Sequence, residues 1–223
     1  MTTRAAVFDV DGTLADTNHL HVTAWWEAFR QAGHDVPMHA IHRSIGLGSH
    51  DLIARLLGED RDKGQDDALS HAHKTLYGTY FDRLPAFRDA GRLLRTLAAG
   101  GWTVVLATSA GGGELSALRR AIDADDAISA TASADDVARG KPAPEPVRQA
   151  LELAGARAAD SVFVGDTVWD MQAGTRAGVT CVGLLCGGIP RADLTEAGAA
   201  VIHDDPADLL AHLNDGPLRD GSS

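Results

Sequence analysis

The chain has 223 residues, of which 44% are hydrophobic and 23% are charged. This is the balance of an ordinary folded globular protein, and the length allows one core domain carrying a smaller insertion. The formal net charge of −11 would repel the phosphate backbone of nucleic acid and anionic membrane surfaces, so we expect neither as a partner.

Targeting signals and disulfides are not expected either. The N-terminal residues Met1 to Arg4 lead directly into a short apolar segment, and no apolar run reaches the length of about 18 residues that a membrane helix needs. Cys181 and Cys186 are the only cysteines, and their apolar surroundings favour buried free thiols over a disulfide or a metal site. We therefore expect a protein of the reducing cytoplasm, as a monomer or a homodimer.

Short apolar segments separated by helix-like stretches predict a parallel α/β sheet. Each segment has the length of a buried strand, and turn-forming residues border several of them. The expected strands are residues 5–10, 103–107, 161–164, 180–185 and 199–202.

The segment between the first two strands is much longer than a crossover connection requires. It shows helical spacing at Val22, Trp25 and Phe29, and Gly33 and Gly58 offer helix stops. We therefore predict a small all-helical domain at residues 17–84, inserted into a core formed by residues 1–16 and 85–223. Within this core, the polar residues 215–223 are expected to be a frayed tail.

Polar residues follow three of the predicted strands at their carboxyl ends. They are Asp9 with Asp11, Thr108 with Ser109, and Asp166 with Asp170. Because ligands bind beyond the carboxyl ends of strands in an open parallel sheet, we expect these side chains to meet in one crevice.

Four aspartates crowded at one sheet edge would repel each other unless a hard cation lies among them. Mg²⁺ suits such a site, because it binds carboxylates, water and the phosphate of a substrate. The alternative for a single aspartate is a turn or a helix cap. For Asp170, which begins a helical stretch, a helix cap explains the residue as well as a metal site does.

Other residues of the same segments suit a phosphate group. The turn at Gly12 and Thr13 can direct backbone N–H groups at an anion, and Thr108 and Ser109 offer hydroxyl donors. Lys141, held between a glycine and a proline, provides the fixed cation that such a site needs, although isolated lysines are usually solvated.

In this order the residues resemble the four motifs of the haloacid dehalogenase-like hydrolases. The motifs are Asp9-x-Asp11-Gly12-Thr13, the strand-terminal Thr108, Gly140-Lys141-Pro142-x-Pro144 and Gly165-Asp166-Thr167-x-x-Asp170. A helical insertion after the first motif is similar to the cap of the phosphoglycolate phosphatase and β-phosphoglucomutase-like subgroup. The resemblance implies a Rossmann-like core with a mobile helical cap.

The resemblance also implies a role for each matched residue. Asp9 corresponds to a nucleophile that forms an aspartyl-phosphate, and Asp11 to the acid and base that serves the leaving alcohol and then water. Thr108 and Lys141 would hold phosphoryl oxygens. Mg²⁺ would be bound by Asp9, the backbone carbonyl of Asp11 and Asp166, with Asp170 binding it through water or orienting Lys141.

Asp11 favours phosphate chemistry, because dehalogenases need no leaving-group acid and lack an aspartate there. The leading interpretation is a Mg²⁺-dependent phosphomonoester hydrolase acting on a small phosphorylated metabolite. A sugar-phosphate mutase of the β-phosphoglucomutase type is the alternative, although the loop Gly46 to His50 lacks the arginine that grips a second phosphate in mutases. His21 and Arg43 are the candidates for substrate contacts from the cap.

Overall fold

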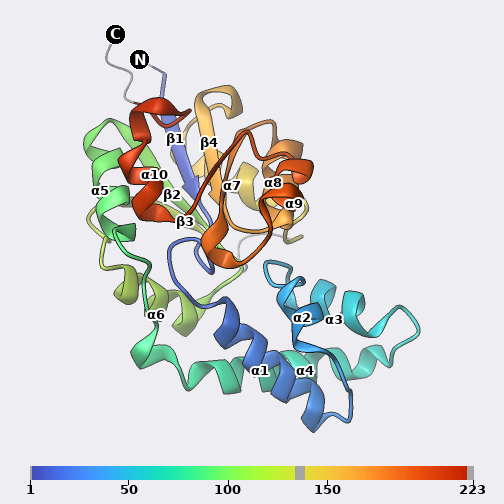
Figure 1. Ribbon diagram of the computed structural model, residues 1–223. Coiled ribbons are helices and arrows are strands. Elements are labelled where there is room, and N and C mark those ends of the chain that lie inside the picture. The colour runs from blue at the N-terminus through green and yellow to red at the C-terminus, as the bar shows by residue number, and fades with distance from the viewer. Residues whose placement is uncertain (1, 134–138, 220–223) are drawn as a thin grey trace.

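The computed structural model describes residues 2–133 and 139–219. Within these residues a six-stranded sheet has the order β3-β2-β1-β4-β5-β6, and every neighbouring pair of strands is parallel (Figure 1). The Rossmann-like α/β fold predicted from the sequence is confirmed. The strands are β1 (Arg4–Phe8), β2 (Trp102–Ala107), β3 (Ile128–Ala132), β4 (Ser161–Gly165), β5 (Thr180–Leu184) and β6 (Val201–His203).

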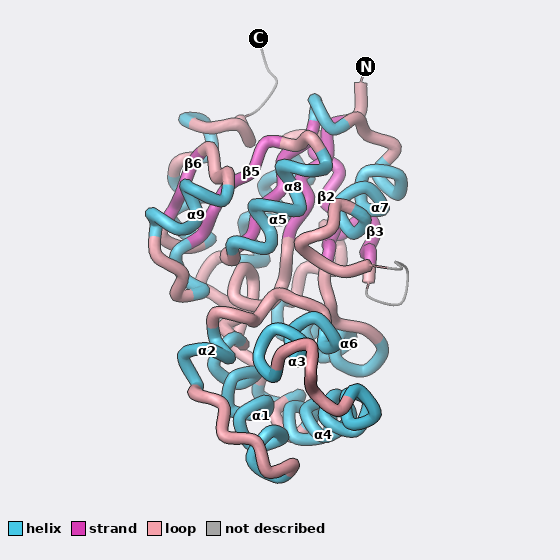
Figure 2. Tube along the Cα trace, turned by 90° about the vertical axis from the view of Figure 1, so that its right-hand side faces the viewer, coloured by secondary structure: helices cyan, strands magenta, loops and turns pink. Residues whose placement is uncertain are grey.

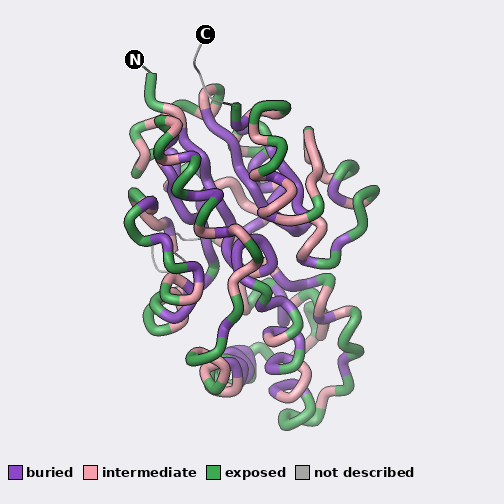
Figure 3. Tube along the Cα trace, turned by 60° about the vertical axis from the view of Figure 1, so that its left-hand side comes forward, coloured by how far each residue is buried: buried purple, intermediate pink, exposed green. Residues whose placement is uncertain are grey.

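Helices cover both faces of this sheet because successive strand side chains point to opposite sides. Ala6 and Phe8 of β1 pack in one apolar cluster, and Ala5 and Val7 pack in another on the opposite face. The first cluster includes residues of α5 (Ala90–Ala99), α6 (Gly112–Ile122) and α10 (Pro206–Ala211), and the second includes residues of α7 (Glu145–Ala154), α8 (Val168–Ala177) and α9 (Arg191–Ala197). Figure 3 shows the burial concentrated along the strands between these layers.

Many apolar residues of the segment 17–84, which we call the helical insert, form a cluster of their own, whereas Ala24, Tyr77 and Leu84 pack in the cluster of the core. Trp25, Phe29, Ile41 and Ile53 belong to the insert's own cluster, and Figures 1 and 2 show the helices of the insert as a group at the carboxyl end of the sheet. The helices are α1 (Asn18–Gln31), α2 (Met38–His42), α3 (Ser49–Leu57) and α4 (Asp66–Gly78). Short 3₁₀ turns occur at Lys63–Gln65, Phe81–Arg83, Ala158–Asp160, Leu185–Gly187 and Leu213–Asp215.

The two links between the insert and the core run side by side. The backbone N–H of Asp16 donates to the carbonyl of Pro85, and that of Phe87 donates to the carbonyl of Leu14, both at 2.9 Å. The chain therefore leaves and re-enters the core at one place, next to the end of β1.

The structure departs from the sequence prediction in three strands. β1 ends at Phe8, two residues before the predicted end, and β6 lies one to two residues later than predicted. Strand β3 was not predicted, because its residues Ile128–Ala132 are mostly small or polar and half-exposed.

The predicted frayed tail is wrong for residues 215–219. Leu218 is 1% exposed and packs in the cluster beneath α5 and α10, while the Arg4 guanidinium donates to the carbonyl of Arg219 at 3.1 Å. These two contacts lie between this end of the chain and the core. The remaining tail residues, 220–223, lie outside the described part of the chain.

Cys181 and Cys186 are free thiols; Cys181 is buried, as expected, whereas Cys186 is only half-buried. Among the described residues, no helix combines the length and the apolar character needed to cross a membrane.

Candidate active site

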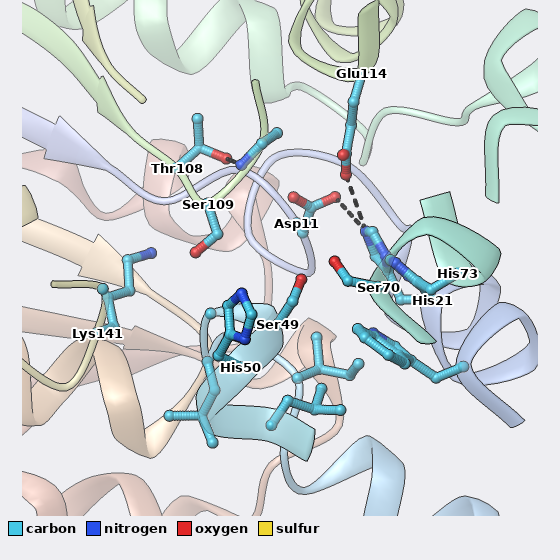
Figure 4. A pocket seen from close by; sticks show the side chains of 18 of the residues that line it. Asp11, His21, Ser49, His50, Ser70, His73, Thr108, Ser109, Glu114 and Lys141 are labelled. Carbon is cyan, nitrogen blue, oxygen red and sulfur yellow. Dashed lines mark hydrogen bonds and ion pairs between the residues drawn. The ribbon is translucent and has the colours of Figure 1, made fainter. Parts of the chain in front are cut away.

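A cavity of about 300 Å³ lies between the carboxyl edge of the sheet and the helical insert (Figure 4). Both parts of the chain contribute to its wall. The core side includes Asp9, Asp11, Thr108, Ser109, Glu114 and Lys141, and the insert side includes His21, Trp25, Ser49, His50, Ser70, His73 and Lys74.

Asp9 is fixed where β1 ends. Its backbone N–H donates to the carbonyl of Val164 at 2.9 Å, which continues the β1–β4 pairing past the strand. Its carboxylate, in a residue only 5% exposed, forms an ion pair with Lys141. The Lys141 ammonium also contacts Asp170 Oδ1 at 2.8 Å. One buried cation therefore joins two of the predicted carboxylates.

Asp166 and Asp170 follow β4, and each is held by a different set of donors. The Thr13 hydroxyl donates to Asp166 Oδ1 at 2.9 Å, and the Asn18 side-chain amide donates to Asp166 Oδ2 at 2.8 Å. Asp170 Oδ2 accepts from the backbone N–H of Thr167 at 3.0 Å, which closes the capping box at the start of α8. Asp170 thus caps a helix and orients Lys141 at the same time.

The carboxylates of Asp9, Asp166 and Asp170 bring excess negative charge together, and the described residues fit a hard divalent cation. Their ligand oxygens lie within 4.8 Å of one another, and all three residues are buried. Burial, followed by the neighbouring carboxylates, raises the pKa of Asp166 well above its usual range. Burial also raises the pKa of Asp9 to about 7, although Lys141 opposes this rise. In addition, Asn18 Oδ1 is buried and accepts no hydrogen bond from the described residues.

Asp11 belongs to a separate group of side chains. Its Oδ1 accepts from the Thr17 hydroxyl at 2.6 Å and lies 3.2 Å from His21 Nε2, which is 3.7 Å from Glu114 Oε1. Burial would raise the pKa of Asp11, but His21 and Thr17 outweigh it and hold the pKa below its usual value. Burial alone would lower the pKa of His21, whereas the charges of Asp11 and Glu114 raise it. Asp11 and His21 therefore form a carboxylate–imidazolium pair.

The hydroxyl and ammonium donors of the core, which were predicted to bind phosphate, lie on the other side of Asp11. Figure 4 shows Thr108, Ser109 and Lys141 to the left of Asp11 and the His21–Glu114 pair to its right. Thr108 Oγ1 accepts from the backbone N–H of Ala110 at 3.0 Å, so the hydroxyl proton stays free to donate into the cavity. Thr108 is held in place by the bond from its backbone N–H to the carbonyl of Ala132 on β3.

The structure corrects the expected role of Gly12 and Thr13 in substrate binding. Their backbone N–H groups donate to the carbonyls of Ala15 and Val10 within the turn, so they do not face an anion. The Gly12 φ of 77° favours glycine, and an added Cβ would lie 2.2 Å from Asn18 Nδ2. Gly12 and Thr13 instead support the carboxylates.

Arg43 also differs from its predicted role. Its guanidinium pairs with Asp193 of the core, and Arg43 does not line the cavity. The ion pair joins the insert to α9. The charge of Arg43 is therefore balanced by Asp193 and is not directed at a substrate. His21, the other candidate from the insert, does line the cavity.

The sequence analysis did not identify Asn18 and Glu114 as site residues. Asn18 begins α1 and Glu114 lies in the first turn of α6. Asparagine and glutamate are both common at the start of a helix, where they cap backbone N–H groups or oppose the helix dipole. The sequence therefore did not distinguish these two residues from ordinary helix-start residues.

The comparisons with known proteins agree with this geometry. A family model for haloacid dehalogenase-like hydrolases matches residues 3–178. The chain belongs to this family. The phosphoglycolate phosphatase of Neisseria gonorrhoeae is 31% identical, over 82% of this chain and 80% of its own. That of Rhodospirillum rubrum is 28% identical, over 92% of this chain and 89% of its own.

Solved structures show the same fold over nearly the whole chain. A hydrolase from Pseudomonas syringae superposes with a TM-score of 0.91 at 34% identity, covering 96% of this chain and 99% of its own. A β-phosphoglucomutase from Clostridium difficile shares the fold with a TM-score of 0.83 at 16% identity, covering 97% of each chain. The prediction of an enzyme of the phosphatase type in this family is therefore confirmed.

Proposed function

We propose that this hydrolase is a Mg²⁺-dependent phosphatase that removes the phosphoryl group from a small metabolite through an aspartyl-phosphate on Asp9. The observation that carries the proposal is the position of Asp9. It lies buried at the end of β1, lines the cavity, pairs with Lys141 and shares a cluster with the carboxylates of Asp166 and Asp170. The names of the curated relatives support the same reaction class.

Asp9, Asp166 and the backbone carbonyl of Asp11 would hold the Mg²⁺, and Asp170 would orient Lys141. A bound Mg²⁺ would offset the repulsion between an anionic nucleophile and an anionic ester. The three carboxylates and the unpartnered Asn18 Oδ1 support a cation at this place.

The chain's own residues would act in two steps. Asp9 attacks the phosphorus while the Lys141 ammonium and the Thr108 hydroxyl stabilise the phosphoryl oxygens. Asp11 receives a proton from His21, whose Nε2 lies 3.2 Å away, and passes it to the leaving alcohol. Asp11 then takes a proton from the water that cleaves the aspartyl-phosphate.

A mutase would need to hold two phosphate groups at once. The described residues that line the cavity include no arginine. Of the two lysines there, Lys141 already contacts two carboxylates, and the charge of Lys74 acts on Glu114. These observations favour hydrolysis over the mutase alternative.

Removal of the metal should abolish turnover. We expect phosphate release from at least one member of a panel of sugar phosphates, phosphoglycolate and nucleotides in the presence of Mg²⁺. EDTA should stop the release, and excess Mg²⁺ should restore it, as measured by inorganic phosphate. Turnover that persists in EDTA after dialysis would contradict the metal dependence. A phosphorylated product formed without inorganic phosphate would instead favour the mutase.

The substitution Asp11→Asn should slow steady-state hydrolysis of alkyl phosphates by about 10²- to 10⁴-fold, the usual contribution of general acid–base catalysis. A nitrophenyl phosphate has a good leaving group and needs no acid. The variant should therefore release one equivalent of nitrophenol rapidly and then stall, because the second step lacks its base. Stopped-flow absorbance measures this burst.

Asp60→Asn is the control for this variant, because Asp60 is exposed and lies outside the cavity. It should keep the wild-type rate with both substrates. Undiminished steady-state turnover of alkyl phosphates by Asp11→Asn would exclude the proposed role.

A further inference from the structure

The end of the cavity beyond Asp11 carries an acidic residue that the proposed reaction does not use. Glu114 projects from α6, and its Oε1 lies 3.7 Å from His21 Nε2. Its side chain is 18% exposed and lines the cavity. Figure 4 shows it on the side of Asp11 away from Lys141, where the alcohol part of a phosphate ester would lie.

Both cationic groups at this end, His21 and Lys74, already act on Glu114. His21 lies between Asp11 and Glu114, and the charge of Lys74 acts on Glu114.

The remaining histidine of this end adds no positive charge. Burial, followed by the charge of His21, lowers the pKa of His73 well below its usual value, so His73 is neutral. A substrate carboxylate placed here would meet Asp11 and Glu114, and it would compete with Glu114 for the charges of His21 and Lys74.

Neutral polar groups complete the wall. Ser49 and Ser70 line the cavity and can donate or accept hydrogen bonds. The Trp25 ring stacks on His73 with their centroids 4.1 Å apart and offers an apolar face. A hydroxylated carbon chain fits this set, because its hydroxyl groups can donate to Glu114 while its C–H groups pack on the ring.

Building on the proposed phosphatase function, we infer that Glu114 selects phosphate esters of neutral, hydroxylated alcohols and rejects esters whose alcohol part carries a carboxylate or a second phosphate. Burial raises the pKa of Glu114 to about 7, although the charges of His21 and Lys74 oppose this rise, so Glu114 is fully ionised only above that pH. There its negative charge acts at short range in a partly dry cavity, where repulsion between like charges is strong. The chain would therefore differ in substrate from the phosphoglycolate phosphatases that it resembles.

Glycerol 3-phosphate and 3-phosphoglycerate form a matched test pair, because a carboxylate replaces one hydroxymethyl group. For the wild type with Mg²⁺ at about pH 8.5, where Glu114 is ionised, we expect kcat/KM to be at least about tenfold higher for glycerol 3-phosphate, which corresponds to about 1.4 kcal/mol. In Glu114→Gln, which keeps the shape of the side chain, the ratio should fall to within about threefold of unity. The ratio is independent of the fraction of folded enzyme, because both substrates are measured on one preparation.

Glu152→Gln is the matched control, since Glu152 is exposed on α7 outside the cavity, and it should keep the wild-type ratio. A wild type that prefers 3-phosphoglycerate, or a Glu114→Gln variant that keeps the wild-type ratio, would overturn this inference alone. Absence of phosphate release from both esters and from an aryl phosphate would overturn the proposed function, and the inference with it.

Discussion

The substitution Asp9→Asn should lower Mg²⁺-dependent hydrolysis of an aryl phosphate by at least about 10⁴-fold, the scale on which loss of a covalent nucleophile acts. The amide is nearly isosteric with the carboxylate but is a poor nucleophile. Lys141 keeps its contact with Asp170 at 2.8 Å, so the variant should remain folded. Steady-state release of nitrophenol, with circular dichroism for the fold, measures both effects.

Asp35→Asn provides the control, because the Asp35 side chain is 90% exposed and lies outside the cavity. It should retain wild-type turnover. If purified Asp9→Asn hydrolysed the ester at more than about a hundredth of the wild-type rate, Asp9 would not be the nucleophile.

Loss of Lys141 should both destabilise and inactivate the protein. Lys141 is 1% exposed and pairs with Asp9 and Asp170, so Lys141→Ala leaves two buried carboxylates without their cation. Breaking a buried ion pair by removing one partner typically costs about 3–5 kcal/mol. We expect a decrease of this size in the free energy of unfolding by urea in EDTA, together with loss of detectable turnover.

Two further variants separate this explanation from a general effect of deleting a lysine. Lys63→Ala, at an exposed position of the insert, should change stability by no more than about 0.5 kcal/mol. Adding Asp170→Asn to Lys141→Ala should recover part of the lost stability, because one unpaired carboxylate is removed. Lys141→Ala with wild-type stability would show that the buried charges are not balanced by this lysine.

The sequence was sufficient to predict which strand ends meet. Asp9, Thr108 and Asp166 each follow a buried apolar segment, and parallel strands place such residues at one edge of the sheet. The strand order then brings β2, β1 and β4 together. Lys141 could be predicted as well, since the local site needs a fixed cation and its glycine and proline neighbours are distinctive.

Features that depend on tertiary contacts could not be predicted. Strand β3 lies at the sheet edge and has no continuous apolar pattern to reveal it. Asn18 contacts Asp166, and Glu114 contacts His21, and in both pairs the two residues are distant in the sequence. Arg43 was assigned to the substrate because an arginine in a cap suggests anion binding, whereas the fold places Asp193 beside it.

The division of the chain into a core and a helical insert of residues 17–84 stays a prediction, as does movement of the insert as a cap. The separate apolar cluster of the insert and its paired links to the core favour this division.

The central claim, that phosphate passes through Asp9, is tested most directly by acid quench of the enzyme during turnover of a radiolabelled phosphate ester with Mg²⁺. We predict acid-stable label on the wild-type chain, up to one per molecule, located in the peptide that contains Asp9. The Asp9→Asn chain should carry none. Label on another residue would contradict the proposed mechanism. The mechanism would also be contradicted if the Asp11→Asn variant, in which the second step should be slow, turned over the ester at the wild-type rate and carried no label.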